Sequence, residues 1–192
     1  MYTEKTFEIP DLRGISQKTI KEHLGLYAGY VKNTNMILAE LENESLSDYI
    51  KAELGRRFSF EYNGMKNHEY YFQSLVGGTT EIPEGILRNK IEEKWNSFEN
   101  FISVFTQLAK TRGVGWAVLA YDKDADALLL TWIDEQHLGH LNSTQYVVGI
   151  DMWEHAFVAD YQPSGKGDYI DDYLSQVNWE HINEEFEKTA QQ

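Results

Sequence analysis

The sequence has no cysteine, few basic residues and no long apolar run. Without cysteine the chain can form no disulfide bond, no zinc–thiolate site and no thiol nucleophile. Its 17 Lys and Arg residues against 31 Asp and Glu give a net charge of -14, which argues against nucleic acid as a partner because phosphate binding needs a basic face. No run of about 18 apolar residues and no basic-then-apolar leader is present, so we expect no membrane span and a cytoplasmic location.

The remaining composition is that of a globular protein. With 192 residues, 42% of them hydrophobic, the chain can bury a core and forms one large or two small domains. The longest Gly- and Pro-containing break covers residues 77–83, so we place a domain boundary there, between residues 1–80 and 81–192.

Hydrophobic periodicity predicts an α+β fold. Residues 1–10 read as an extended arm lying over the domain. Apolar residues at helical intervals predict a helix over 17–43, a short helix over 45–52 capped by Ser45 or Ser47, and a second long helix over 57–76. The second part shows helices at 84–94 and 97–111 and strands at 115–121, 127–132 and 146–150. We therefore expect an N-terminal long helical hairpin domain, then a C-terminal domain of helices around a small three-stranded antiparallel sheet.

The end of the last predicted strand carries the chemistry. Asp151 directly follows the predicted strand, and His155 comes four residues later, with Trp153 and Glu154 between them. Such an Asp and His are most often a helix cap and a surface side chain. In a dry, aromatic-lined pocket, however, mixed oxygen and nitrogen ligands suit iron or manganese.

These residues resemble the D-x-W-E-H signature of the iron/manganese superoxide dismutases. Further segments are similar to motifs of the same family, and together they cover nearly the whole chain: Tyr30–Asn33, Asn67–Phe72, Gly113–Leu119, Ala159–Gln162 and Val177–Glu180. The resemblance implies one manganese or iron ion bound by His23, His68, Asp151 and His155. By itself, His23 among Leu and Tyr residues would read as a core-edge histidine.

The resemblance also implies which residues surround the metal and its ligands. Trp116 and Trp153 would line its pocket. A count back from Asp151 without gaps puts Gln136 beside the metal-bound solvent, which leaves His137 and His140 as structural or interface residues. Many iron enzymes carry a glutamine where this chain has Gly64, so the pattern slightly favours manganese.

The implied activity is disproportionation of superoxide to dioxygen and hydrogen peroxide. Tyr30 would extend the proton path from Gln136 and is favoured over Tyr27 as the gateway residue, because the residues after it match the family. Glu154 would orient the ligand histidine of a second subunit across a two-fold axis, which implies a homodimer or a dimer of dimers.

Departures from the family pattern keep alternatives open. Tyr27 replaces a histidine, and Phe157 and Val158 replace two tyrosines, so the usual Tyr–His bridge between subunits cannot form. The first helix also lacks one residue. These changes suit a degenerate scaffold or binding protein that keeps the fold without turnover. Two histidines and a carboxylate also form the facial triad of non-haem iron oxygenases, although that class normally sits in a β-barrel.

Overall fold

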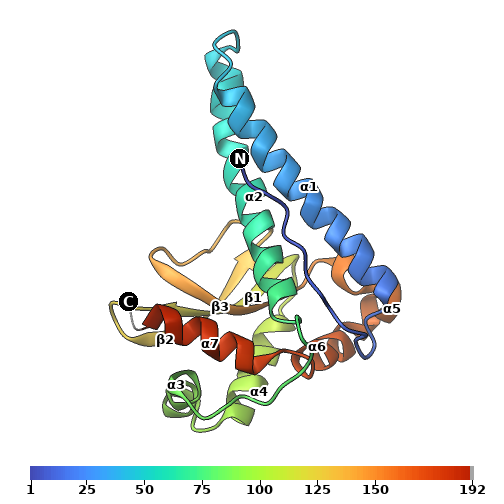
Figure 1. The fold of residues 1–192 in the computed structure, drawn as a ribbon, viewed down its shortest axis with the longest axis vertical. Coiled ribbons are helices and arrows are strands. Elements are labelled where there is room, and N and C mark those ends of the chain that lie inside the picture. Colours follow the sequence, from blue (N-terminus) through green and yellow to red (C-terminus); the bar gives the residue numbers. More distant parts are fainter. Residues whose placement is uncertain (191–192) are drawn as a thin grey trace.

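The N-terminal half is a long helical hairpin. The structure is a computed structural model and describes residues 1–190. Helix α1 (Gln17–Leu41) runs outward and helix α2 (Asp48–Gln73) returns antiparallel beside it, so that the hairpin projects from the rest of the molecule (Figure 1). The other helical elements are α3 (Ile86–Trp95), α4 (Phe98–Ala109), η1 (Glu154–Ala156), α5 (Val158–Tyr161), η2 (Pro163–Gly165), α6 (Lys166–Leu174) and α7 (Trp179–Ala190).

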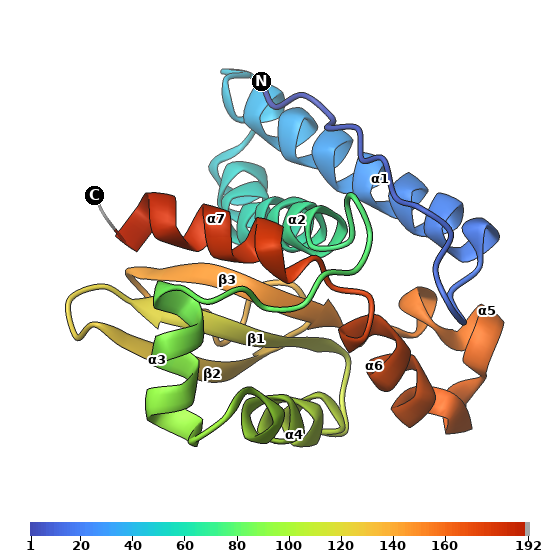
Figure 2. The same ribbon diagram turned by 60° about the horizontal axis from the view of Figure 1, so that its bottom comes forward.

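A small antiparallel sheet forms the centre of the second half. Its strands are β1 (Gly115–Asp122), β2 (Ala127–Asp134) and β3 (Thr144–Asp151), in the order β2-β1-β3. Helices α2 and α7 lie over one face and α4 lies under the other (Figure 2). Residues 115–121 of β1 are all buried, as expected of a central strand covered on both sides. The predicted α+β architecture is confirmed.

The second helix differs from the sequence prediction. Instead of a short helix over 45–52 and a separate one from residue 57, α2 is continuous from Asp48 and is capped by Ser47, whose side chain accepts from the Ile50 N–H. The misleading segment lies near the tip of the hairpin, where Tyr49 and Ile50 stay exposed and Gly55 has open space around it. Residues 53–56, which join the two predicted helices, include no buried side chain, so the sequence there gives no apolar signal that the helix continues.

The predicted N-terminal arm is also present and crosses the hairpin (Figure 1). The Lys5 N–H donates to the Tyr27 hydroxyl at 2.9 Å, and the Phe7 ring packs against the rings of Tyr27 and Phe72. The Lys5 ammonium lies 2.9 Å from the buried Glu69 carboxylate. In residues 1–190 no helix is both long and apolar enough to cross a membrane.

Asp160 ties the start of α1 to the segment after β3. Its Oδ2 accepts from the Ser16 N–H at 2.8 Å and from the Thr19 hydroxyl at 2.7 Å. Burial by itself would raise the pKa of Asp160, but the Thr19 and Ser16 donors hold it below the ordinary value. The ionised carboxylate therefore stabilises the folded state.

We expect Asp160→Ala to lower the free energy of unfolding by about 1 kcal/mol at pH 7, a value kept small because the carboxylate is largely exposed. A group whose folded pKa is depressed contributes above its unfolded pKa of about 3.9 and loses that contribution as the pH falls. Urea unfolding should thus show the wild-type advantage at pH 7 and a smaller one at about pH 3. Asp171→Ala is the matched control, because that carboxylate is exposed and has no hydrogen bond or ion pair within residues 1–190. A constant difference at both pH values would contradict the role of the ionised form.

Candidate metal centre

Four separate elements bring the predicted ligands to one place. His23 comes from α1, His68 from α2, Asp151 from the end of β3 and His155 from η1. One donor atom from each lies within 4.8 Å of all the others, and in residues 1–190 these four residues, termed the ligand cluster below, are the only group of this kind. His23, His68 and Asp151 are buried, while His155 keeps 23% of its side chain exposed.

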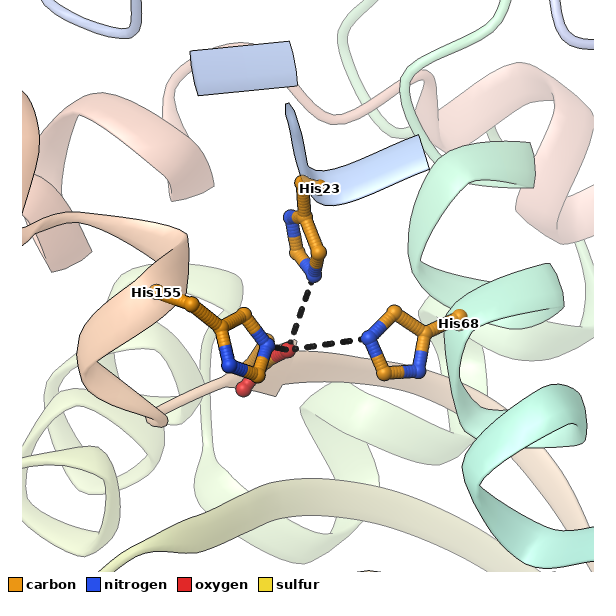
Figure 3. Close-up of side chains that lie close together, drawn as sticks. His23, His68 and His155 are labelled. Atoms are coloured by element: carbon orange, nitrogen blue, oxygen red, sulfur yellow. Dashed lines mark hydrogen bonds and ion pairs between the residues drawn. The ribbon is translucent and has the colours of Figure 1, made fainter. Parts of the chain in front are cut away.

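The three histidines direct the same ring nitrogen at one carboxylate oxygen. Their Nε2 atoms lie 3.0 Å (His23), 3.1 Å (His155) and 3.6 Å (His68) from Asp151 Oδ2. In Figure 3 the three imidazoles approach this point from different sides. A carboxylate oxygen surrounded by imidazole nitrogens at these distances is a donor set suited to one metal ion of intermediate softness.

His68 supplies the observation that tests whether a metal fits. Its Nδ1 lies 2.6 Å from the Gly64 carbonyl oxygen, so Nδ1 carries the proton and donates it. Its Nε2 is then unprotonated, is buried, and has no hydrogen-bond partner among residues 1–190. Leaving such a polar atom unpaired is costly. A cation between His68 and Asp151 would remove that cost, and a ligand histidine bound through one nitrogen with the other held by a carbonyl is the usual arrangement.

The local electrostatics keep the cluster ready for a cation. Burial, followed by the neighbouring His23, lowers the pKa of His68 to about 3, and burial also lowers the pKa of His23. Burial by itself would raise the pKa of Asp151, but His155 and His23 hold it well below its usual range. At neutral pH the cluster therefore offers an ionised carboxylate together with neutral His23 and His68.

Asp151 is held from both its side chain and its backbone. Its Oδ1 accepts the Trp153 N–H at 2.8 Å, and its backbone carbonyl accepts the Tyr169 hydroxyl at 2.9 Å. Across the sheet it pairs with Trp116, whose ring lies 5.1 Å from that of His68. The Trp153 ring stacks on His155 at 5.8 Å. Both tryptophans predicted to line the pocket thus lie beside ligand histidines.

Gln136 joins two other predicted residues next to the cluster. Its Nε2 donates to the Tyr30 hydroxyl at 3.0 Å, and its Oε1 accepts from Trp116 Nε1 at 3.0 Å. The Tyr30 ring lies 5.0 Å from that of His68. Burial, and then the charge of Asp151, raises the pKa of Tyr30 to about 12. Tyr30 is therefore a protonated hydroxyl at neutral pH, held in line with the Gln136 amide.

Comparison with known proteins shows the family of the chain. Residues 83–185 match the family model for the C-terminal domain of iron/manganese superoxide dismutases. The chain is 33% identical over 173 residues to an iron superoxide dismutase of Pyrobaculum aerophilum, covering 86% of this chain and 81% of that protein. It is 32% identical over 190 residues to the iron enzyme of Aquifex aeolicus, at 93% and 87% coverage, and 32% identical over 167 residues to a manganese superoxide dismutase of Mycolicibacterium fortuitum, at 85% and 80% coverage. The chain belongs to the iron/manganese superoxide dismutase family.

In this superoxide dismutase family member, Tyr27 and Tyr30 of α1 contact different residues. Tyr27 is fully buried, and its hydroxyl contacts Lys5 of the arm and the Glu69 carboxylate. Tyr30 instead reaches Gln136 and His68. Of these two tyrosines, Tyr30 is therefore the one that contacts both Gln136 and a histidine of the ligand cluster.

Gly64 has a steric role that the sequence did not reveal. A Cβ added at Gly64 would lie 2.5 Å from Cδ1 of Tyr30, far inside van der Waals contact. The space that a glutamine would need at this position, as in many iron enzymes of the superoxide dismutase family, is filled by the Tyr30 ring. The amide beside the cluster is supplied instead by Gln136, from the loop after β2.

The other predicted residues of this region have less direct contacts. Glu154 is exposed and makes no hydrogen bond or ion pair through its side chain to any part of the chain that the structure describes. His137 packs its ring edge-on against Phe60 at 5.5 Å. His140 lies 3.2 Å from the Gln136 carbonyl oxygen, a contact that the sequence analysis did not predict.

Asn67 and Tyr169 are further residues near the site that the sequence analysis did not assign. Asn67 Nδ2 donates to the Gln136 carbonyl at 3.0 Å. Its position directly before His68, inside a segment similar to the family, was the available signal. Tyr169, which holds the Asp151 carbonyl from α6, had no local signal, because nothing in its own segment reports a contact with β3.

Proposed function

We propose that this chain is a superoxide dismutase in which His23, His68, Asp151 and His155 bind one iron or manganese ion. The observation that carries the proposal is the convergence of three Nε2 atoms on Asp151 Oδ2, with the buried His68 Nε2 left without a hydrogen-bond partner in the described part of the chain. The bound ion would supply one-electron redox chemistry at a potential between the two superoxide couples. Overall, two superoxide ions and two protons give one dioxygen and one hydrogen peroxide.

The chain's own residues would orient the site and supply protons. Gln136 would hydrogen-bond the solvent molecule next to the ligand cluster and tune its acidity, since groups just outside the ligands control such properties. Tyr30, still protonated at neutral pH, would hold a proton at its hydroxyl for the peroxide product. Trp116 and Trp153 would exclude bulk water from the ligands, consistent with the full burial of Trp116.

We further propose that manganese is slightly favoured, because Gln136 rather than a residue at position 64 supplies the amide. The support is limited to this pattern, since relatives similar to the chain are named for iron, for manganese and for both metals. Separate reconstitution with each metal, followed by activity per bound ion, tests the preference.

The product balance tests the proposed function. Superoxide supplied to the metal-loaded chain should disappear faster than it does spontaneously, and dioxygen and hydrogen peroxide should form at about one each per two superoxide ions. The alternative, a degenerate scaffold with the dismutase fold, predicts little bound metal and no acceleration. Stoichiometric metal with peroxide but no dioxygen would instead indicate a one-way reductase.

We also propose that the active form is a homodimer, with Glu154 contacting His155 of a second copy. Glu154 is exposed and its side chain has no partner within residues 1–190, and His155 is the one partly exposed member of the ligand cluster. A carboxylate buried at such an interface is satisfied only while the dimer exists.

Glu154→Ala is accordingly expected to weaken dimerisation and to reduce metal affinity or activity by roughly 10- to 100-fold, because His155 loses its orienting acceptor. Size-exclusion chromatography and activity over a dilution series measure both effects. Glu184→Ala, which removes another exposed glutamate from α7, should change neither. A fully active wild-type monomer would refute the dimer proposal.

A further inference from the structure

Gln136 lies in a loop rather than in a helix or strand, so other contacts must fix its position. The loop follows β2 and is closed by two backbone bonds, from the Asp134 N–H to the Leu138 carbonyl at 2.8 Å and from the Leu138 N–H to the Asp134 carbonyl at 3.2 Å. Gly139 then has a φ of +98°, and a Cβ there would lie 2.8 Å from the Trp132 carbonyl oxygen. Only glycine fits this close approach comfortably, and the turn brings His140 back beside Gln136.

The backbone carbonyl of Gln136 receives two side-chain hydrogen bonds. Asn67 Nδ2 donates to it at 3.0 Å from α2, and His140 Nε2 lies 3.2 Å from it within the loop. A carbonyl oxygen has two lone pairs, so both can be engaged at once. Asn67 stands directly before His68 on the same helix. One of the two bonds therefore connects the loop to a helix of the ligand cluster.

We propose that Asn67 and His140 form a peptide clamp that positions Gln136 for the reaction. This inference rests on the proposed function, in which Gln136 contacts the solvent beside the metal. The Gln136 side chain already bonds Tyr30 and Trp116 at its far end, so its remaining freedom is a tilt of its own peptide unit. The clamp restricts that tilt and thereby sets how closely the amide approaches the ligand cluster.

The two clamp residues can be replaced without changing the neighbouring contacts. His137 is adjacent in sequence, but its ring packs on Phe60, and it makes no side-chain bond to Gln136. Asn67 is 1% exposed, and its Oδ1 has no hydrogen-bond partner among the residues that the structure describes. Replacing Asn67 with leucine, which is of similar size, therefore removes a single hydrogen bond. His140 is exposed on its outer side, so its ring can be replaced with little disturbance to packing.

The test uses the metal-loaded full chain with His140→Phe, His140→Gln and Asn67→Leu. His140→Phe keeps a ring without a donor, whereas His140→Gln keeps a donor of similar reach. We expect His140→Phe and Asn67→Leu to retain the metal, to shift the reduction potential, and to lower kcat/KM about tenfold, the lower end of the range for outer-shell partners. His140→Gln should restore both values. His181→Phe, which replaces a histidine of α7 bonded to Gln73, should match the wild type.

The results that would overturn the clamp differ from the result that would overturn the proposed function. An active wild type with unchanged potential and kcat/KM in both His140→Phe and Asn67→Leu would overturn the clamp while leaving the proposed function intact. Loss of metal from both variants would also overturn it, because the residues would then hold the ligand cluster rather than Gln136. If one of the two variants does not fold, the other decides. A metal-loaded wild type without activity would overturn the proposed function and the clamp with it.

Discussion

His68→Ala is expected to purify with almost no iron or manganese. The substitution removes one of the four proposed ligands, and its imidazole cannot be replaced by a neighbour because the other three donor groups already belong to the cluster. Metal affinity should fall by more than about 100-fold, since even partners outside the ligands are worth 10- to 100-fold. Activity should fall in proportion to the metal.

The loss should not come from unfolding. His68 Nε2 has no partner within the described chain, so alanine removes an unsatisfied buried atom together with the ring. Most of the helix content should therefore remain in far-ultraviolet circular dichroism. Elemental analysis of the purified variant measures the effect, with His181→Ala as the control because His181 lies outside the ligand cluster. Full metal occupancy in His68→Ala would refute its role as a ligand.

Gln136→Ala is expected to keep its metal but lose activity, by about 10- to 100-fold, and to shift the reduction potential. The amide lies beside the cluster without belonging to it, and its loss removes the bonds to Tyr30 and Trp116. The fully buried Trp116 N–H would be left unsatisfied, at a cost of about 1–3 kcal/mol in the free energy of unfolding.

His137→Ala is the matched control for Gln136→Ala, because it changes the next residue of the same loop. Metal analysis, potentiometry and activity on both variants should show effects only at Gln136. The reverse result, a large effect at His137 and none at Gln136, would mean that the count back from Asp151 is one residue out.

Much of the fold followed from local sequence patterns. The helices carrying His23 and His68 had clear hydrophobic periodicity, and the strand before Asp151 was a short apolar run, because each packs apolar residues against the core. Residues 53–56 of α2 include no buried side chain, so the continuity of this helix could not be read from the pattern. The division at residues 77–83 stays a prediction.

The site was predictable as a set of residues but not as a geometry. Resemblance to the family named His23, His68, Asp151 and His155, but not the unpartnered Nε2 of His68, which depends on the Gly64 carbonyl one turn earlier. The sequence showed only that Gly64 stands where many family members have a glutamine. The structure shows why a side chain does not fit there: the ring of Tyr30, which is distant in sequence, fills the space.

The contacts of the Gln136 loop could not be predicted from the sequence either, because they also depend on how the chain folds. His140 reaches the Gln136 carbonyl only because Gly139 adopts a left-handed conformation, and Asn67 meets the same carbonyl from a helix 69 residues away. Neither contact follows from periodicity or from spacing along the chain. The contacts of single residues in this loop could therefore be assigned only from the three-dimensional structure.

The most direct test of the central claim is the superoxide decay rate, measured by stopped-flow spectroscopy on wild-type preparations of different metal occupancy. If the ligand cluster holds a catalytic iron or manganese ion, the rate above spontaneous decay should rise linearly with bound metal and reach zero for the metal-free chain. A rate that stays at the spontaneous value while one ion per chain is bound would contradict the account.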